Sequence, residues 1–132
     1  MAGVLRLQHV SVPIPPERVD EGRAFYTGVL GMSEIPVPES LIGVALVWFQ
    51  ASDDGDEVHL YAEKNPAERV SGQHLCLQID DIDDFAAKLV KQGITVEETT
   101  VIPGRPRRMV FDPFGNQIEL MQMKPEPAGV AS

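Results

Sequence analysis

The sequence has 132 residues, of which 43% are hydrophobic and 23% charged, and these globular values exclude a disordered or fibrous chain. Eleven lysines and arginines against 20 aspartates and glutamates give a formal net charge of −9, which argues against non-specific binding to nucleic acid or anionic membrane. There is one cysteine, no apolar run long enough to span a membrane and no signal-peptide segment, so we expect a cytoplasmic protein without internal disulfides.

The first half of the chain predicts a strand, a helix and three further strands. Polar and apolar residues alternate over Gln8–Val12, as in a half-buried strand. A helical stretch follows over Val19–Leu30, and Gly31 is placed to end it as a C-terminal cap. Three strand-like runs come next, and a polar turn joins the last two; they are Ser33–Val37, Val44–Gln50 and Glu57–Ala62.

The second half repeats this order. Gln73–Leu77 predicts a strand, Ile82–Gln92 predicts a helix, and Gly93 is placed to end that helix. Three strand-like runs follow, at Thr95–Thr99, Arg107–Asp112 and Gln117–Met123.

The internal repeat predicts an α+β fold made of two βαβββ modules, residues 1–66 and 67–132. Each module alone would bury too little surface, so we expect two modules to pack, within one chain or between chains, as curved mixed sheets around a ligand trough. The polar segment Glu63–Ser71 is the expected boundary, and the tail 124–132 is expected to fray.

Four residues with metal-ligand chemistry occupy equivalent places in the two modules. His9 lies on the first strand of module one and His59 on its last strand, while His74 and Glu119 hold the same places in module two. Because side chains alternate between the faces of a strand, each of the four falls on the more polar face of its strand. We therefore expect them to line the concave side together.

Neutral imidazoles and a carboxylate suit one divalent ion such as Zn, Ni, Co, Mn or Fe. A buried, unpaired Glu119 would be costly, and a bound ion would remove that cost. Taken singly, each histidine is more often an ordinary core or surface residue. The prediction of a metal site depends on the agreement of position, face and residue type.

Other residues are candidates of a weaker kind. Trp48, Tyr61 and Phe111 could line a substrate pocket, although aromatic residues at strand spacing are more often core. Arg105, Arg107 and Arg108 form the only basic cluster. They could hold a substrate carboxylate or phosphate, but we interpret them as part of a solvated hairpin. The sequence contains no nucleophile elbow, P-loop or dinucleotide-binding fingerprint.

The sequence resembles the vicinal oxygen chelate superfamily, which contains glyoxalase I, methylmalonyl-CoA epimerase, extradiol dioxygenases and the fosfomycin and bleomycin resistance proteins. The resemblance covers residues 5–123. DPFGNQIEL is its most specific stretch, followed by FYTGVLGM; the other matching stretches are LQHVSVPIP, EVHLYAE and HLCLQIDDIDDFAAKLVKQGI. The superfamily signal is strong, but it says little about the reaction.

The resemblance implies paired βαβββ modules and puts His9, His59, His74 and Glu119 on the four metal-ligand positions. It also implies a homodimer in which each site takes His9 and His59 from one chain and His74 and Glu119 from the other. His59 departs from the pattern, because glyoxalase I usually has a glutamate there and the epimerase a glutamine.

The expected activity is that of a glyoxalase-like lyase or isomerase, which moves a proton on a small molecule with vicinal oxygens. Glu119 is the predicted base because it is the only carboxylate in the ligand set, with His59 second. Two alternatives stay open. One is an extradiol-type dioxygenase using His9, His74 and Glu119. The other is a drug-binding resistance protein without catalysis.

Overall fold

The computed structural model describes residues 2–43, 45–63 and 72–124, and it confirms an α+β fold with two mixed sheets. The chain divides into two compact units, Met1–Ser71 with Pro113–Asn116, and Gly72–Asp112 with Gln117–Ser132. We call them unit 1 and unit 2. Most of the expected boundary, residues 64–71, and the tail 125–132 lie outside the described residues.

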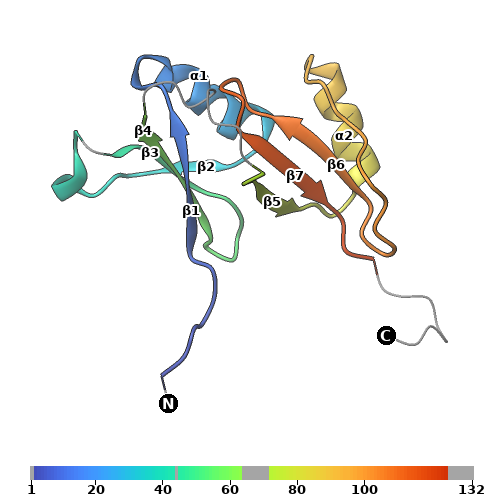
Figure 1. Ribbon diagram of the computed structural model, residues 1–132. Coiled ribbons are helices and arrows are strands. Elements are labelled where there is room, and N and C mark those ends of the chain that lie inside the picture. The colour runs from blue at the N-terminus through green and yellow to red at the C-terminus, as the bar shows by residue number, and fades with distance from the viewer. Residues whose placement is uncertain (1, 44, 64–71, 125–132) are drawn as a thin grey trace. The chain divides into compact units, whose positions relative to one another are not determined.

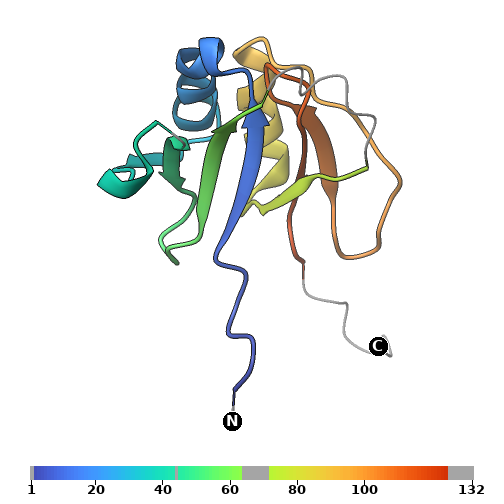
Figure 2. The ribbon, with the colours of Figure 1, turned by 60° about the vertical axis from the view of Figure 1, so that its left-hand side comes forward.

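Unit 1 holds a four-stranded sheet of order β1-β4-β3-β2. β1 and β4 are parallel, and the arrows of these two strands point the same way in Figure 2, whereas the other pairs are antiparallel. The strands are β1 (His9–Ile14), β2 (Ser33–Ile35), β3 (Ala45–Gln50) and β4 (Glu57–Ala62). Two short 3-10 turns, η1 (Pro16–Arg18) and η3 (Glu39–Leu41), complete the unit together with its helix.

The helix of unit 1 changes its winding along its length. The predicted stretch Val19–Leu30 forms α1 (Val19–Arg23) and continues directly as a π-helix, η2 (Ala24–Val29). Gly31 follows with a φ of 79°, a value that favours glycine because it has no Cβ. Figure 1 shows this helix lying across one face of the unit 1 sheet.

The core of unit 1 occupies the sheet face under this helix. Alternate apolar residues of the strands point there, since successive side chains take opposite faces. Tyr26 is fully buried and stacks on Phe49, with ring centroids 5.5 Å apart. The other buried apolar residues of the unit are Val12, Ile14, Phe25, Met32, Val47, Val58, Leu60 and Phe114. The opposite face of the same strands is left for polar residues.

Unit 2 holds a three-stranded sheet of order β5-β7-β6 and one helix (Figure 1). Its elements are β5 (Leu75–Gln78), α2 (Ile82–Lys91), β6 (Arg107–Phe111) and β7 (Gln117–Met121). β5 and β7 are parallel, and β6 and β7 form an antiparallel hairpin. Asp81 caps α2 by accepting a hydrogen bond from the backbone N–H of Asp84 at 3.1 Å. Among the described residues, no helix has the length and apolarity of a membrane span.

The strand predicted over Thr95–Thr99 is not formed. Only Glu97 pairs there, through an isolated antiparallel bridge to Met109. Just after this segment, the carbonyl of Thr100 accepts hydrogen bonds from Nε and Nη2 of Arg107, at 3.1 and 2.9 Å. This carbonyl is therefore bonded to a side chain. The second βαβββ pattern is therefore one strand short. The strand predicted over Gln73–Leu77 also begins later, so that His74 directly precedes β5.

Candidate functional site

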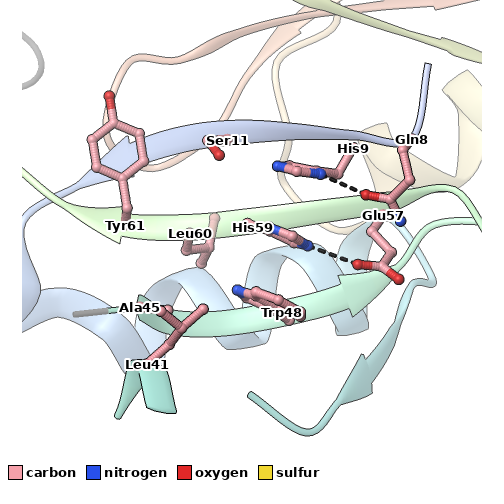
Figure 3. A pocket seen from close by; sticks show the side chains of 10 residues that line it. All are labelled: Gln8, His9, Ser11, Leu41, Ala45, Trp48, Glu57, His59, Leu60 and Tyr61. Atoms are coloured by element: carbon pink, nitrogen blue, oxygen red, sulfur yellow. Dashed lines mark hydrogen bonds and ion pairs between the residues drawn. The ribbon is translucent and has the colours of Figure 1, made fainter. Parts of the chain in front are cut away.

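A pocket of about 540 Å³ lies on the polar face of the unit 1 sheet (Figure 3). It is lined by residues of three neighbouring strands, of the segment before β1, and of η3. These residues are Gln8, His9, Ser11, Leu41, Ala45, Trp48, Glu57, His59, Leu60 and Tyr61. The predicted residues His9, His59, Trp48 and Tyr61 thus lie together in one pocket.

Three of the pocket's rings form a continuous stack. Trp48 lies opposite His59 in the β3–β4 register, and their rings are 3.8 Å apart and parallel within 1°. The other face of the His59 ring meets His9 from β1, with centroids 4.0 Å apart and an angle of 19°. The stack fixes the plane of the His59 ring, whose side chain is only 9% exposed.

Hydrogen bonds select which nitrogen of each ring carries a proton. His9 donates from Nδ1 to the side-chain carbonyl of Gln8 at 2.5 Å, since that oxygen can only accept. His59 donates from Nε2 to Oε1 of Glu57 at 2.8 Å. In the neutral rings, the lone pair therefore lies on Nε2 of His9 and on Nδ1 of His59.

Unit 2 brings together the other two predicted ligands. His74 Nε2 lies 2.9 Å from Oε1 of Glu119, and His74 Nδ1 donates to the carbonyl of Gly72 at 2.8 Å. Both ring nitrogens thus face oxygen acceptors, an arrangement that favours the imidazolium form. The pKa of His74 is accordingly raised, first by the Gly72 hydrogen bond and then by Glu119, against the opposing effect of burial.

Glu119 has a second partner that the sequence interpretation did not anticipate. Its side chain is 6% exposed, and Oε2 accepts from Nη1 of Arg107 at 3.2 Å. The prediction that Arg107 belongs to a solvated hairpin is wrong, because its side chain is only 16% exposed and is bonded to Thr100 and Glu119. The premise that Glu119 is unpaired is also wrong.

A sequence signal existed for both missed residues. Glu57 stands two positions before His59 on one strand, so both point to the same face. The β6–β7 hairpin pairs Met109 with Glu119, which puts Arg107 two positions from that pair on the same face. For His59 the signal is an acceptor two residues along its own strand, and for Glu119 it is a donor two residues from its partner on the neighbouring strand of the hairpin.

Phe111, the third aromatic candidate, lies on β6 of unit 2 and is 44% exposed. It is not among the residues that line the unit 1 pocket. Within residues 2–43, 45–63 and 72–124, no three His, Cys, Asp or Glu side chains form a cluster ready to hold a metal.

The donor chemistry nevertheless fits a divalent ion. Each unit contributes a pair of donors, His9 with His59 and His74 with Glu119, and each histidine has at least one ring nitrogen bonded to an oxygen. That arrangement is usual for metal-ligating histidines. For His74 to hold an ion through Nε2, it would have to lose a proton from that nitrogen.

Comparison with known proteins identifies the family of this chain. Residues 6–120 match the Glyoxalase/Bleomycin resistance protein/Dioxygenase superfamily. No match was found among the curated proteins. A glyoxalase family protein from Bacillus anthracis is similar in structure, with a TM-score of 0.81 and 34% identity, over 94% of this chain and 99% of that one.

Two further solved structures share the fold. TnmS3, an antibiotic binding protein from Streptomyces sp. CB03234, has a TM-score of 0.68 and 25% identity, over 94% of this chain and all of that one. Lactoylglutathione lyase from Agrobacterium tumefaciens has a TM-score of 0.67 and 22% identity, over 89% and 92% of the two chains. On the match over residues 6–120 and the 34% identical relative, this chain belongs to the Glyoxalase/Bleomycin resistance protein/Dioxygenase superfamily.

Proposed function

We propose that this protein is a divalent-metal-dependent enzyme of the glyoxalase type, a lyase or isomerase that moves a proton on a small molecule with vicinal oxygens. The observation that carries the proposal is the donor set. His9 and His59 stack 4.0 Å apart in one pocket, and His74 lies 2.9 Å from Glu119. Three imidazoles and one carboxylate suit Zn, Ni, Co, Mn or Fe.

A bound ion of this kind polarises a chelated carbonyl and stabilises the negative charge that develops when a neighbouring proton leaves. The protein's own part is to hold the substrate and to take that proton. Glu119 is the proposed base. Once loosened from the ion, Glu119 would accept the proton on Oε1, which now faces His74, while Arg107 holds Oε2.

The substrate contacts proposed from the sequence are Trp48, Tyr61 and Phe111. Trp48 and Tyr61 support a small-molecule substrate because they line the same pocket as His9 and His59. Leu41 and Ala45 add apolar surface to that pocket. An apolar wall with a polar end is typical of pockets that orient a small ligand.

Metal analysis followed by an activity panel tests this function. Chelator-treated protein is reloaded with each first-row divalent ion, and we expect one ion per site. The loaded protein is then assayed with 2-oxoaldehyde–thiol hemithioacetals, with a catechol, and with cationic antibiotics. Proton-transfer turnover that is lost in Glu119→Gln supports the proposal. Oxygen uptake with the catechol would contradict the proton-transfer function and support the dioxygenase function instead.

A drug-binding function is the second candidate, and the Arg107–Glu119 ion pair favours it. Arg107 neutralises Glu119 without a metal, at 3.2 Å, so unit 2 is electrostatically satisfied as it stands. The similarity to an antibiotic binding protein points the same way. Protein that takes up no divalent ion, yet binds an antibiotic tightly without turnover, would establish this function in place of the enzyme.

A further inference from the structure

The His59 ring is covered on both faces in the unit 1 pocket, and its hydrogen bond to Glu57 decides which ring nitrogen points to which side. The Trp48 and His9 rings cover its two faces, at 3.8 and 4.0 Å. Stacking fixes the ring plane but is compatible with two ring orientations, which differ by a half-turn about the Cβ–Cγ bond. The hydrogen bond from Nε2 to Glu57, at 2.8 Å, removes that freedom (Figure 3).

The strand geometry explains why Glu57 can do this. Glu57 and His59 are the first and third residues of β4, so their side chains leave the sheet on the same face. The Glu57 side chain is 21% exposed, and its hydrogen bond to His59 is partly shielded from water. A carboxylate that accepts an N–H bond in such surroundings is a strong partner.

We propose that Glu57 is a positioning residue that keeps the Nε2 proton of His59 and presents Nδ1 as its donor nitrogen. The metal part rests on the proposed function, whereas the positioning itself holds in the metal-free protein. His59 would then bind through the opposite nitrogen from His9 and His74, whose Nδ1 atoms are already bonded to oxygen. The carboxylate also makes the ring a better donor.

Imidazole NMR of the metal-free protein tests the positioning directly. The chain has three histidines, so the spectrum is simple, and His59→Gln identifies the signal of His59. At a pH where the rings are neutral, we expect His59 to carry its proton on Nε2 and to exchange it slowly. Glu57→Leu, which removes the acceptor, should make that proton exchange fast. A proton on Nδ1, or unchanged slow exchange in Glu57→Leu, overturns the proposal.

Titration with Co²⁺, followed by visible absorption, tests the effect on binding. We expect Glu57→Leu to weaken Co²⁺ affinity about 10–100-fold, as loss of a partner behind a ligating histidine usually does. Glu57→Gln keeps an acceptor oxygen and should lose less. Glu63→Leu is the matched control, because Glu63 accepts from Tyr61 with the same two-residue spacing, at 3.3 Å, and should bind Co²⁺ like the wild type.

The two measurements separate the failure of this inference from the failure of the proposed function. Wild-type protein that binds no Co²⁺ contradicts the proposed function, and the NMR result alone then decides the role of Glu57. Co²⁺ binding that is equal in wild type, Glu57→Leu and Glu57→Gln contradicts the role of Glu57 and leaves the proposed function standing. Should Glu57→Leu not fold, the tautomer of His59 in the wild type decides, and a proton on Nδ1 overturns the role.

Discussion

At the scale of single residues, Arg107 carries a structural role that its exposed neighbour Arg105 does not share. Replacing Arg107 by Met leaves the buried Glu119 with His74 as its remaining charged partner. We expect Arg107→Met to lower the free energy of unfolding by about 1–3 kcal/mol, the usual cost of a buried polar group that loses a partner. Urea denaturation measures this.

Arg105→Met is the matched control for Arg107→Met. Its residue is exposed, and we expect a change within about 0.5 kcal/mol, as for most surface substitutions. Equal stabilities of the two variants would show that the ion pair with Glu119 contributes nothing to folding.

The raised pKa of His74 predicts a pH-dependent stability in the metal-free protein. A group whose pKa is raised on folding stabilises the folded protein. This stabilisation is fully present at pH values below the group's ordinary pKa, which is about 6.5 for histidine. That stability is lost as the pH rises through the higher pKa of the folded state. We expect the stability difference between wild type and His74→Gln to shrink as the pH rises through this range.

Urea midpoints measured in chelator at a series of pH values test this dependence. A stability difference that stays constant, or grows with pH, would contradict a His74 imidazolium held by Gly72 and Glu119.

At the scale of elements, the close approach of α1 to the unit 1 sheet depends on Gly22. A Cβ at this position would lie 2.9 Å from Cδ1 of Leu60 and 3.2 Å from Cδ1 of Ile14, both fully buried side chains. Overpacking of this kind costs about 1–3 kcal/mol, against about 1 kcal/mol gained from the helix propensity of alanine. We expect Gly22→Ala to be destabilised.

Gly28→Ala is the control within the same helical segment. A Cβ at Gly28 meets nothing within 4 Å, and the residue is exposed, so the substitution should be neutral or stabilising. Thermal unfolding of both variants measures the contrast. If Gly22→Ala is as stable as Gly28→Ala, the contact between helix and sheet is looser than these distances require.

At the scale of the whole molecule, the two donor pairs lie on different units, and we propose that a homodimer joins them. His9 and His59 would come from one protomer and His74 and Glu119 from its partner. Two double variants test this arrangement, one with both unit 1 ligands changed to Ala and one with both unit 2 ligands changed. Each alone should bind no ion at the site.

Refolding the two double variants together gives the decisive result. In a shared site, each mixed dimer regenerates one intact site of two, so a random mixture recovers about a quarter of the wild-type metal capacity for a twofold-symmetric dimer. Sites formed within one chain recover none. Light scattering on the wild type, with a dimer expected, completes the test.

The sequence by itself determined the local structure and the face of each strand on which a side chain lies. The pattern predicted β4 with its observed bounds and α2 within one residue, because period-two alternation and capping residues are local properties. It also put His9, His59 and Trp48 on three strands of the first module, and the structure brings these three rings together. Family membership followed from the same stretches, above all DPFGNQIEL.

The tertiary structure alone decided which charges pair. Glu57 and His59 lie two residues apart on one strand, so the local pattern puts them on one face, but the rotamers decide that they bond. The Arg107–Glu119 pair depends on the β6–β7 register as well. The strand expected over Thr95–Thr99 is also decided at this level, because only Glu97 pairs there, through its bridge to Met109. A buried carboxylate needs partners among the groups that the fold brings near it, and for Glu119 these are His74 and Arg107.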